Sequence, residues 1–284
     1  MAKDPAMGPV SVGQSSGQVG LANAPELETQ GFEVAPSAPI KVVIWAGGRG
    51  TRLHDVTKGV LPKPMIRVGD IPLLEHIMRG YSAQGFRNFI IAGGYLREVI
   101  EDWVVSHENI SEFADNITVV DTGIDTQTGG RLARLADHLA GTDVFLATYG
   151  DGLSDVNLVA LLEFHKNLTH PTGLPMVTLT AANPPARFGN LVINDGYAVS
   201  FGEKTQVPDA WINSGFYVID TGVLNLIPGD NSRFEYDILP ILAVQHRLGA
   251  FQHPGYFQMC DTWRDFQTLK TQWAGGQPPW RRWG

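Results

Sequence analysis

The chain has 284 residues, of which 43% are hydrophobic, and this is enough to bury a large core as one α/β domain or two smaller ones. Its formal net charge of −8 argues against nucleic-acid binding, which needs a basic surface, and its single cysteine, Cys260, excludes a disulfide framework and a multi-thiolate metal site. No apolar run approaches the roughly 20 residues that cross a bilayer, and no signal peptide is evident, so we expect a cytoplasmic protein with no membrane partner.

The first 39 residues differ in composition from the rest of the chain. Residues 1–39 contain Gly, Ser, Pro, Ala and Gln with few large apolar side chains and no sustained periodicity. Such a segment buries too little apolar surface to fold, so we predict a disordered N-terminal extension. We expect residues 40–284 to form a single domain.

From Lys41 onward, predicted strands and helices alternate. Apolar runs of strand length occur in 41–45, 86–94, 117–121 and 144–149, and helical spacing occurs in 72–85, 96–105, 129–141 and 155–167. This alternation predicts an α/β fold: a three-layer, Rossmann-like domain whose mostly parallel central sheet carries helices on both faces.

The pattern changes after about residue 175. Short strands separated by turn residues are predicted at 176–181, 189–195, 197–203 and 212–220. We expect them to extend the sheet in antiparallel or mixed fashion and to carry a second half-site. Predicted helices at 236–249 and 262–276 close the chain.

A glycine-rich loop, "AGGRGTRL" at 46–53, follows the first predicted strand. It is neither a dinucleotide fingerprint, because Leu53 stands at the third glycine position, nor a P-loop, because no Gly-Lys-Ser/Thr closes it. What remains is a glycine turn with two cations at a strand's carboxyl end, where main-chain N–H groups can hold phosphate oxygens. An ordinary tight turn is the alternative.

A lysine between two prolines follows about a dozen residues later, in "LPKPM" at 61–65. The prolines stiffen the backbone around Lys63 and pre-organise its ammonium. Alone, the pattern also suits a surface lysine. At this spacing, "GGRGTR" and "PKPM" together resemble the signature of the sugar-1-phosphate nucleotidyltransferases.

Two aspartates are candidate ligands for Mg²⁺, which prefers a few carboxylates together with phosphate oxygens and water. Asp151 lies between glycines directly after the strand at 144–149, and Asp261 lies between a strand-like segment and a helix. Asp261 could instead be the N-cap of that helix. Asp265, one turn further on, is interpreted as structural.

The segment from about 41 to 283 resembles the glucose-1-phosphate cytidylyltransferase branch of that superfamily. The similar motifs are "DTGIDTQTGGRL", "TYGDGLSDVN", "PPARFGNL", "INSGFYV", "QHPGYFQMCDTWRD" and "PPWRRW". The resemblance implies the nucleotide-diphospho-sugar transferase fold, with a nucleotide-binding half over about 40–155 and a sugar-binding half over about 156–284. It also implies a homo-oligomer.

The implied reaction transfers CMP from CTP to a sugar 1-phosphate, α-D-glucose 1-phosphate in this branch, giving CDP-glucose and pyrophosphate with Mg²⁺ as cofactor. The resemblance assigns catalytic roles to Arg52, Lys63 and Asp151. It assigns nucleotide binding to Ala46, Gly47, Gly48, Gly50, Thr51, Thr126, Arg131 and Gly150. It assigns sugar-phosphate binding to Lys204 and Asn213, and the metal to Asp151 and Asp261.

Several positions depart from the family's pattern. Leu61 stands where a lysine is common, Thr205 replaces a proline after Lys204, Ser214 replaces a glycine, and the segment 101–118 is shorter. These departures leave three alternatives open: a UTP- or dTTP-dependent enzyme, another sugar phosphate, or a non-catalytic protein that binds sugar nucleotides.

No activated nucleophile is expected from the sequence. A sugar phosphate is itself anionic, so the implied reaction needs no Ser, Cys or His triad. The eight histidines show no metal-ligand or nucleophile–base spacing, and His76, between apolar neighbours on a predicted helix, is interpreted as structural.

Overall fold

The computed structural model describes residues 39–168, 173–183, 190–194, 197–202 and 210–283. The described residues all belong to one unit of the chain. The predicted extension, up to residue 38, and the candidate Lys204 lie outside the described residues.

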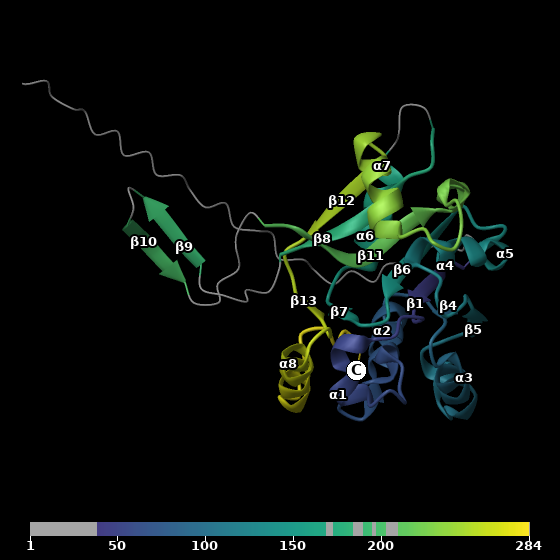
Figure 1. The fold of residues 1–284 in the computed structure, drawn as a ribbon, viewed down its shortest axis with the longest axis horizontal. Helices are drawn as coiled ribbons and strands as arrows, with labels where there is room; N and C mark the ends of the chain where they lie inside the picture. The colour runs from purple at the N-terminus through teal and green to yellow at the C-terminus, as the bar shows by residue number, and fades with distance from the viewer. Residues whose placement is uncertain (1–38, 169–172, 184–189, 195–196, 203–209, 284) are drawn as a thin grey trace, which may run out of the picture. The chain divides into compact units, whose positions relative to one another are not determined.

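A seven-stranded mixed sheet is the central element, with strand order β12-β8-β11-β6-β1-β4-β5 (Figure 1). Its strands are β1 (Lys41–Trp45), β4 (Asn88–Gly93), β5 (Asn116–Asp121), β6 (Val144–Tyr149), β8 (Val177–Ala182), β11 (Ile212–Asp220) and β12 (Leu248–His253). Strand β1 pairs in parallel with β4 and β6, and β4 with β5. Strand β11 runs antiparallel to β6 and β8, whereas β12 is parallel to β8. The predicted mostly parallel, mixed sheet is confirmed.

Each predicted helical segment contains a helix, although the one predicted over 129–141 is divided into two and the short first helix was not predicted. They are α1 (His54–Thr57), α2 (Leu73–Ser82), α3 (Arg97–Ser106), α4 (Thr128–Arg134), α5 (Ala136–Leu139), α6 (Leu158–Asn167), α7 (Leu239–Val244) and α8 (Trp263–Ala274). A π turn, Phe234–Ile238, precedes α7, and 3-10 turns cover Thr51–Leu53, Lys63–Met65, Ile110–Glu112 and Thr221–Leu226. None of the described helices has the length and apolar character needed to cross a membrane.

Alternate residues of the central strands pack into two separate cores. In β1, Val42 and Ile44 face the core that contains α2, α3, α6 and α8, whereas Val43 and Trp45 face the core that contains α4, α5 and α7. This period-2 division is what a sheet covered on both faces requires, so the three layers follow directly from the strand sequences.

Two parts of the second half differ from the prediction. Strands β9 (Asn190–Asn194) and β10 (Tyr197–Gly202) form their own two-stranded antiparallel sheet rather than an extension of the central one. The helix predicted over 236–249 ends at Val244, and after His246, whose φ is +55°, the chain enters β12. As an edge strand β12 buries few side chains, which is why its sequence pattern is weak.

Two further strand pairs complete the described fold. Strand β2 (Arg67–Val68) pairs with β3 (Ile71–Pro72), and β7 (Gly152–Ser154) pairs with β13 (Phe257–Met259). The second pair is important for the site, because it brings the segment before Asp261 beside the segment after Asp151.

The winding direction of the sheet reverses at β1. Strands β4 and β5 follow on one side of β1, and the chain then returns to β6 on the other side. In open α/β sheets a crevice forms beyond the carboxyl ends of the strands at such a switch point. The loops after β1 and β6 therefore define the expected ligand site.

Candidate active site

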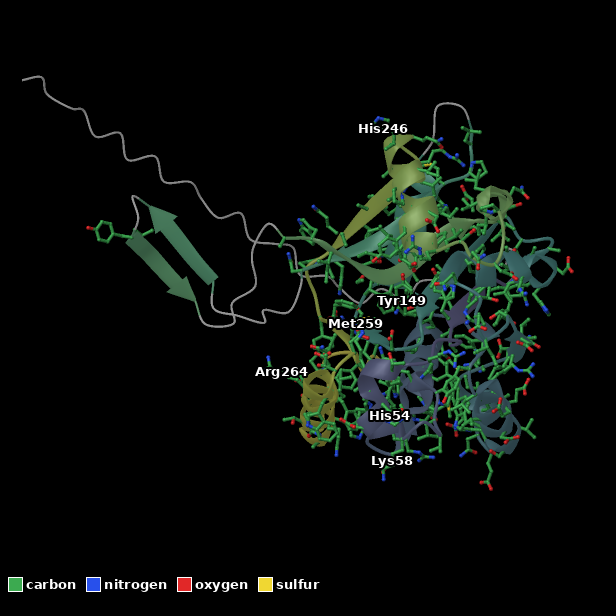
Figure 2. All side chains as sticks on the ribbon, viewed as in Figure 1. His54, Lys58, Tyr149, His246, Met259 and Arg264 are labelled. Carbon is green, nitrogen blue, oxygen red and sulfur yellow. The ribbon has the colours of Figure 1, made fainter. Side chains whose placement is uncertain are left out.

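A cavity of about 680 Å³ opens at the carboxyl ends of β1 and β6. Twelve of the fourteen predicted site residues line it: Ala46, Gly47, Gly48, Gly50, Thr51, Arg52, Lys63, Thr126, Arg131, Gly150, Asp151 and Asp261. Asn213, on β11, lies outside this wall. Figure 2 shows two residues of the cavity wall, Tyr149 and Met259, within the outline of the ribbon. The exposed Lys58 projects from its lower edge.

Glycines bring the main chain close to the cavity at three points. Gly50 has φ +58°, a left-handed conformation that L side chains rarely adopt. A Cβ on Gly47 would lie 2.1 Å from the Arg131 guanidinium, whereas a Cβ on Gly48 would meet nothing within 4 Å. A Cβ on Gly150 would lie 2.7 Å from Pro64 Cγ. Gly47 and Gly150 are thus required by packing, while Gly48 leaves space for a ligand.

Arg131 is buried and ties three loops together. Its Nη1 donates to Gly93 O at 3.0 Å and Thr122 Oγ1 at 2.6 Å, and its Nη2 donates to Gly47 O at 3.0 Å and Ile124 O at 3.3 Å. Burial lowers the pKa of this guanidinium. Because both terminal nitrogens already have two acceptors, the geometry favours Arg131 as a holder of the glycine loop over a direct donor to a base.

Lys63 lies at the centre of an ion-pair cluster. Its ammonium donates to the carboxylates of both Asp151 and Asp261, and Arg52 Nη1 lies 2.9 Å from Asp261 Oδ2. The Lys63 side chain is 13% exposed, so these pairs are poorly screened by water. The predicted lysine, arginine and two aspartates, which are up to 209 residues apart, thus form one cluster.

The charges of this cluster depend on one another. Burial alone would lower the pKa of Lys63, but the attraction of Asp151 and Asp261 and their hydrogen bonds outweigh burial and raise that pKa. Burial raises the pKa of Asp151, and Lys63 opposes that shift. The ammonium is therefore a fixed positive charge at neutral pH, as phosphate binding requires.

The two aspartates fit a divalent cation. Both carboxylates reach one ammonium, so a single cation can contact both, and Asp151 Oδ1 is buried without a hydrogen-bond partner. Within the described residues, no group of three or more His, Cys, Asp or Glu side chains could hold a metal ion. Two carboxylates leave the remaining positions of an octahedral Mg²⁺ to phosphate oxygens and water.

The structure resolves the alternative roles of the two late aspartates. The N-cap of α8 is Thr262, whose side chain accepts from Asp265 N, while Asp265 accepts from Thr262 N at 2.8 Å in a capping box. Asp261 is therefore not the cap, and its carboxylate points to Lys63 and Arg52. The structural interpretation of Asp265 agrees with this geometry.

His76 belongs to a second buried polar cluster. Its Nε2 bonds Val68 O at 2.8 Å, and its Nδ1 accepts from Trp280 Nε1 at 3.3 Å. Trp280 is 1% exposed, so this pair anchors the C-terminal segment to α2. Burial lowers the pKa of His76 to about 4, and the structural interpretation of this histidine fits a neutral, fully bonded ring.

The sequence analysis missed part of the cavity wall. Tyr149, at the end of β6, and Thr128, at the start of α4, both line the cavity, and both donate hydrogen bonds to Glu235. Tyr149 directly precedes Gly150 and Asp151, so the strand-end rule that selected Asp151 would also have found it. Nothing in the sequence signalled Glu235, because it lies 86 residues away from Tyr149 in an unremarked segment.

An open α/β sheet with a glycine loop, fixed cations and paired carboxylates at its switch point is the arrangement of a nucleotide-binding transferase. Residues 41–276 match the family model described as nucleotidyl transferase. The chain belongs to this family.

The chain is most informatively compared with two curated relatives and one solved structure. Glucose-1-phosphate cytidylyltransferase of Salmonella typhimurium (strain LT2) is 41% identical over 264 residues, which cover 86% of this chain and all of that protein. A probable glucose-1-phosphate cytidylyltransferase of Bacillus subtilis (strain 168) is 35% identical over 262 residues, with the same coverage. Among solved structures, HddC from Yersinia pseudotuberculosis complexed with GMP-PN has a TM-score of 0.63 at 24% identity, covering 82% of this chain and 99% of that one. The first two confirm the resemblance seen in the sequence, and the third supports the fold.

Proposed function

We propose that the protein transfers CMP from CTP to α-D-glucose 1-phosphate, giving CDP-glucose and pyrophosphate. The observation that carries this proposal is the convergence of the glycine loop, Lys63, Asp151 and Asp261 on one cavity at the sheet's switch point. The similarity to cytidylyltransferases over their whole length supports the choice of substrates.

In this reaction an oxygen of the sugar phosphate attacks the α-phosphorus of CTP. A new P–O bond forms, and the bond to pyrophosphate breaks. Because the attacking group is already an anion, the protein's task is to align two polyanions and stabilise charge at phosphorus. This explains how a site without an activated Ser, Cys or His can perform the transfer.

The side chains of the cavity suit separate parts of this task. The main-chain N–H groups of residues 46–51, together with Arg52, hold the departing pyrophosphate. Lys63, fixed by its carboxylate partners, neutralises charge on the reacting phosphates. Asp151 and Asp261 would hold Mg²⁺, which would supply additional positive charge to stabilise the reacting phosphates.

We assign recognition of the nucleotide's base to the loop that contains Thr126. Residues Ile124 to Thr128 line the cavity, and Arg131 fixes Ile124 relative to Gly47. Cytosine has a 4-amino donor where uracil and thymine have an acceptor, so main-chain carbonyls of this loop would select cytosine. The wrong base would leave buried groups unpaired.

Turnover with different nucleotides tests the proposal. The full chain is incubated with glucose 1-phosphate, Mg²⁺ and CTP, UTP, dTTP or GTP, and pyrophosphate release is followed. We expect CTP to be used fastest. Faster release with another nucleotide would overturn the base assignment, and nucleotide binding without release for any sugar phosphate would indicate a non-catalytic binding protein. A cytoplasmic location and a homo-oligomeric state stay predictions.

A further inference from the structure

A chain of four side chains runs behind the cavity wall. Tyr149 Oη donates to Glu235 Oε1 at 2.5 Å, the hydroxyls of Tyr149 and Tyr217 are 2.9 Å apart, and Asn213 Nδ2 donates to Tyr217 Oη at 2.5 Å. The chain begins in the π turn Phe234–Ile238, crosses β6 and ends on β11. It therefore connects an acidic residue outside the cavity wall to the candidate sugar-binding asparagine.

The direction of every bond in this chain follows from its acidic end. A carboxylate only accepts, so Tyr149 must donate its hydrogen bond to Glu235. Tyr149 then accepts from Tyr217, and Tyr217 accepts from the amide nitrogen of Asn213. Such chains strengthen cooperatively, because each donated proton makes its oxygen a better acceptor.

The amide of Asn213 is consequently fixed in one orientation. Its Oδ1 accepts from Gly215 N at 3.0 Å. Its Nδ2 carries two hydrogens and donates one of them to Tyr217 Oη. Gly215 has φ +80°, and a Cβ there would lie 2.2 Å from the Tyr149 ring, so the backbone at this point is shaped around the chain. The second N–H of the exposed Asn213 is left to donate outward.

Glu235 also holds the nucleotide side of the cavity. Its Oε2 accepts from Thr128 Oγ1 at 2.6 Å, and Thr128 O accepts from Trp45 Nε1 at 3.0 Å. Thr128 and Tyr149 both line the cavity, so one carboxylate fixes the wall on the base side and the asparagine on the sugar side.

We propose that Glu235 is a positioning residue that sets the amide orientation of Asn213 and so makes this asparagine a donor to an acceptor oxygen of the sugar phosphate. The inference rests on the proposed function for the identity of that ligand. If Glu235 loses its charge, the Tyr149–Tyr217 bond can reverse, and Tyr217 then points its hydrogen at Asn213 Nδ2, which only donates. The Asn213 amide accepts from Tyr217 only if it turns over, gives up its bond from Gly215 N and places its oxygen where the outward N–H had been. A phosphate oxygen of the sugar phosphate, which only accepts, would then meet another acceptor.

The test compares Glu235→Gln with Asp237→Asn in the full chain. Asp237 lies in the same π turn and accepts from Arg233 N at 2.7 Å, but it is not part of the chain of hydroxyls, so this variant controls for local destabilisation. We expect Glu235→Gln to raise the KM for glucose 1-phosphate about tenfold, as loss of one hydrogen bond does, and to raise the KM for CTP as well, because Glu235 also holds Thr128. No rise in the KM for glucose 1-phosphate, or the same rise in Asp237→Asn, would overturn the proposal.

Two further variants locate the effect. Tyr217→Phe removes the middle hydroxyl and leaves Glu235 bonded to Tyr149 and Thr128, so we expect the same rise in the KM for the sugar phosphate. In an Asn213→Ala background, Glu235→Gln should add no further rise, because the residue it orients is absent. An additive effect would contradict the proposal.

A readout without turnover separates this inference from the proposed function. In the ¹⁵N-labelled chain, the side-chain amide resonances of Asn213, assigned by their loss in Asn213→Ala, should shift in Glu235→Gln and not in Asp237→Asn. Unshifted resonances would overturn the positioning role even if CTP is used. Shifted resonances in a protein that releases no pyrophosphate would leave the hydrogen-bond chain intact and refute the proposed function alone.

Discussion

Two buried polar clusters join the first part of the chain to its C-terminal part, and they differ in how fully their groups are satisfied. Around Lys63, two carboxylates share one ammonium, and Asp151 Oδ1 has no hydrogen-bond partner. Around His76, both ring nitrogens are bonded, one to Val68 O and one to the Trp280 indole.

The difference separates a site from a structural contact. A buried polar group without its full set of bonds costs free energy, so its persistence indicates a ligand that completes the set. A fully bonded neutral group contributes to stability and has no capacity left for a ligand. We therefore expect substitutions in the Lys63 cluster to lower turnover, and those in the His76 cluster to lower stability.

The largest effect is expected at Asp151. Asp151→Asn keeps the volume of the side chain but removes the charge that holds Lys63 and the proposed Mg²⁺. Turnover should fall by about 10²–10³, the usual cost of one preorganised electrostatic contact, while the melting temperature changes little because Lys63 remains paired with Asp261.

Asp155 provides the matched control for that loss. It lies four residues further on and binds Tyr256 N at 2.7 Å and Arg282 at 2.9 Å, outside the cavity wall. Asp155→Asn should lower the melting temperature more than turnover. Wild-type rates in a folded Asp151→Asn protein would remove Asp151 from the mechanism.

The pH dependence of stability tests the second cluster. Burial lowers the pKa of His76 from 6.5 to about 4, so below pH 6.5 the unfolded chain binds a proton that the folded chain excludes. The contribution of His76 is thus fully present above pH 6.5 and is lost as pH falls toward 4. Between pH 7 and pH 5 the loss should be about 2 kcal/mol.

Urea unfolding at several pH values measures this loss. The control is His76→Gln, which cannot titrate and should therefore show a flatter dependence of the free energy of unfolding on pH. Parallel curves for the two proteins would mean that the ring is not held neutral by burial.

Two neighbouring glycines of the site, Gly47 and Gly48, differ in the same way: one is needed for packing and the other leaves space for a ligand. In Gly47→Ala the new methyl group meets the buried Arg131 guanidinium, which four acceptors hold in place, so ligand-free stability should fall by about 1–2 kcal/mol. Gly48→Ala adds the same methyl group where nothing lies within 4 Å, and stability should change by less than about 0.5 kcal/mol. Thermal unfolding without nucleotide compares the two, and equal losses would contradict the packing of Gly47 on Arg131.

The smallest effect is expected for an exposed ion pair at the cavity mouth. Arg49 and Asp125 are 3.1 Å apart, with side chains that are 55% and 90% exposed. Such pairs contribute little and are screened by salt, so Asp125→Asn should change the free energy of unfolding by less than about 1 kcal/mol. A larger, salt-independent loss would show that this contact resembles the buried clusters.

The sequence predicted those features that follow from short-range pattern. Strand ends are recognisable, so the glycine loop, Asp151 and the winding of the first half could be located. Asp261 could be singled out by its place between a strand-like segment and a helix, but its contact with Lys63 could not be predicted, because 198 residues separate them. Glu235 could not be found, since its role depends on a π turn that brings it to Tyr149. Strand β12 was missed because an edge strand needs few buried side chains.

The site's geometry is tested most directly by a crystal structure of the protein with CTP, in which Mn²⁺ replaces Mg²⁺ and is located by its anomalous signal. The account predicts an anomalous peak between the carboxylates of Asp151 and Asp261, with the triphosphate against residues 46–52 and Lys63 turned to a phosphate oxygen. A triphosphate bound elsewhere, or no peak beside these two aspartates, would contradict it.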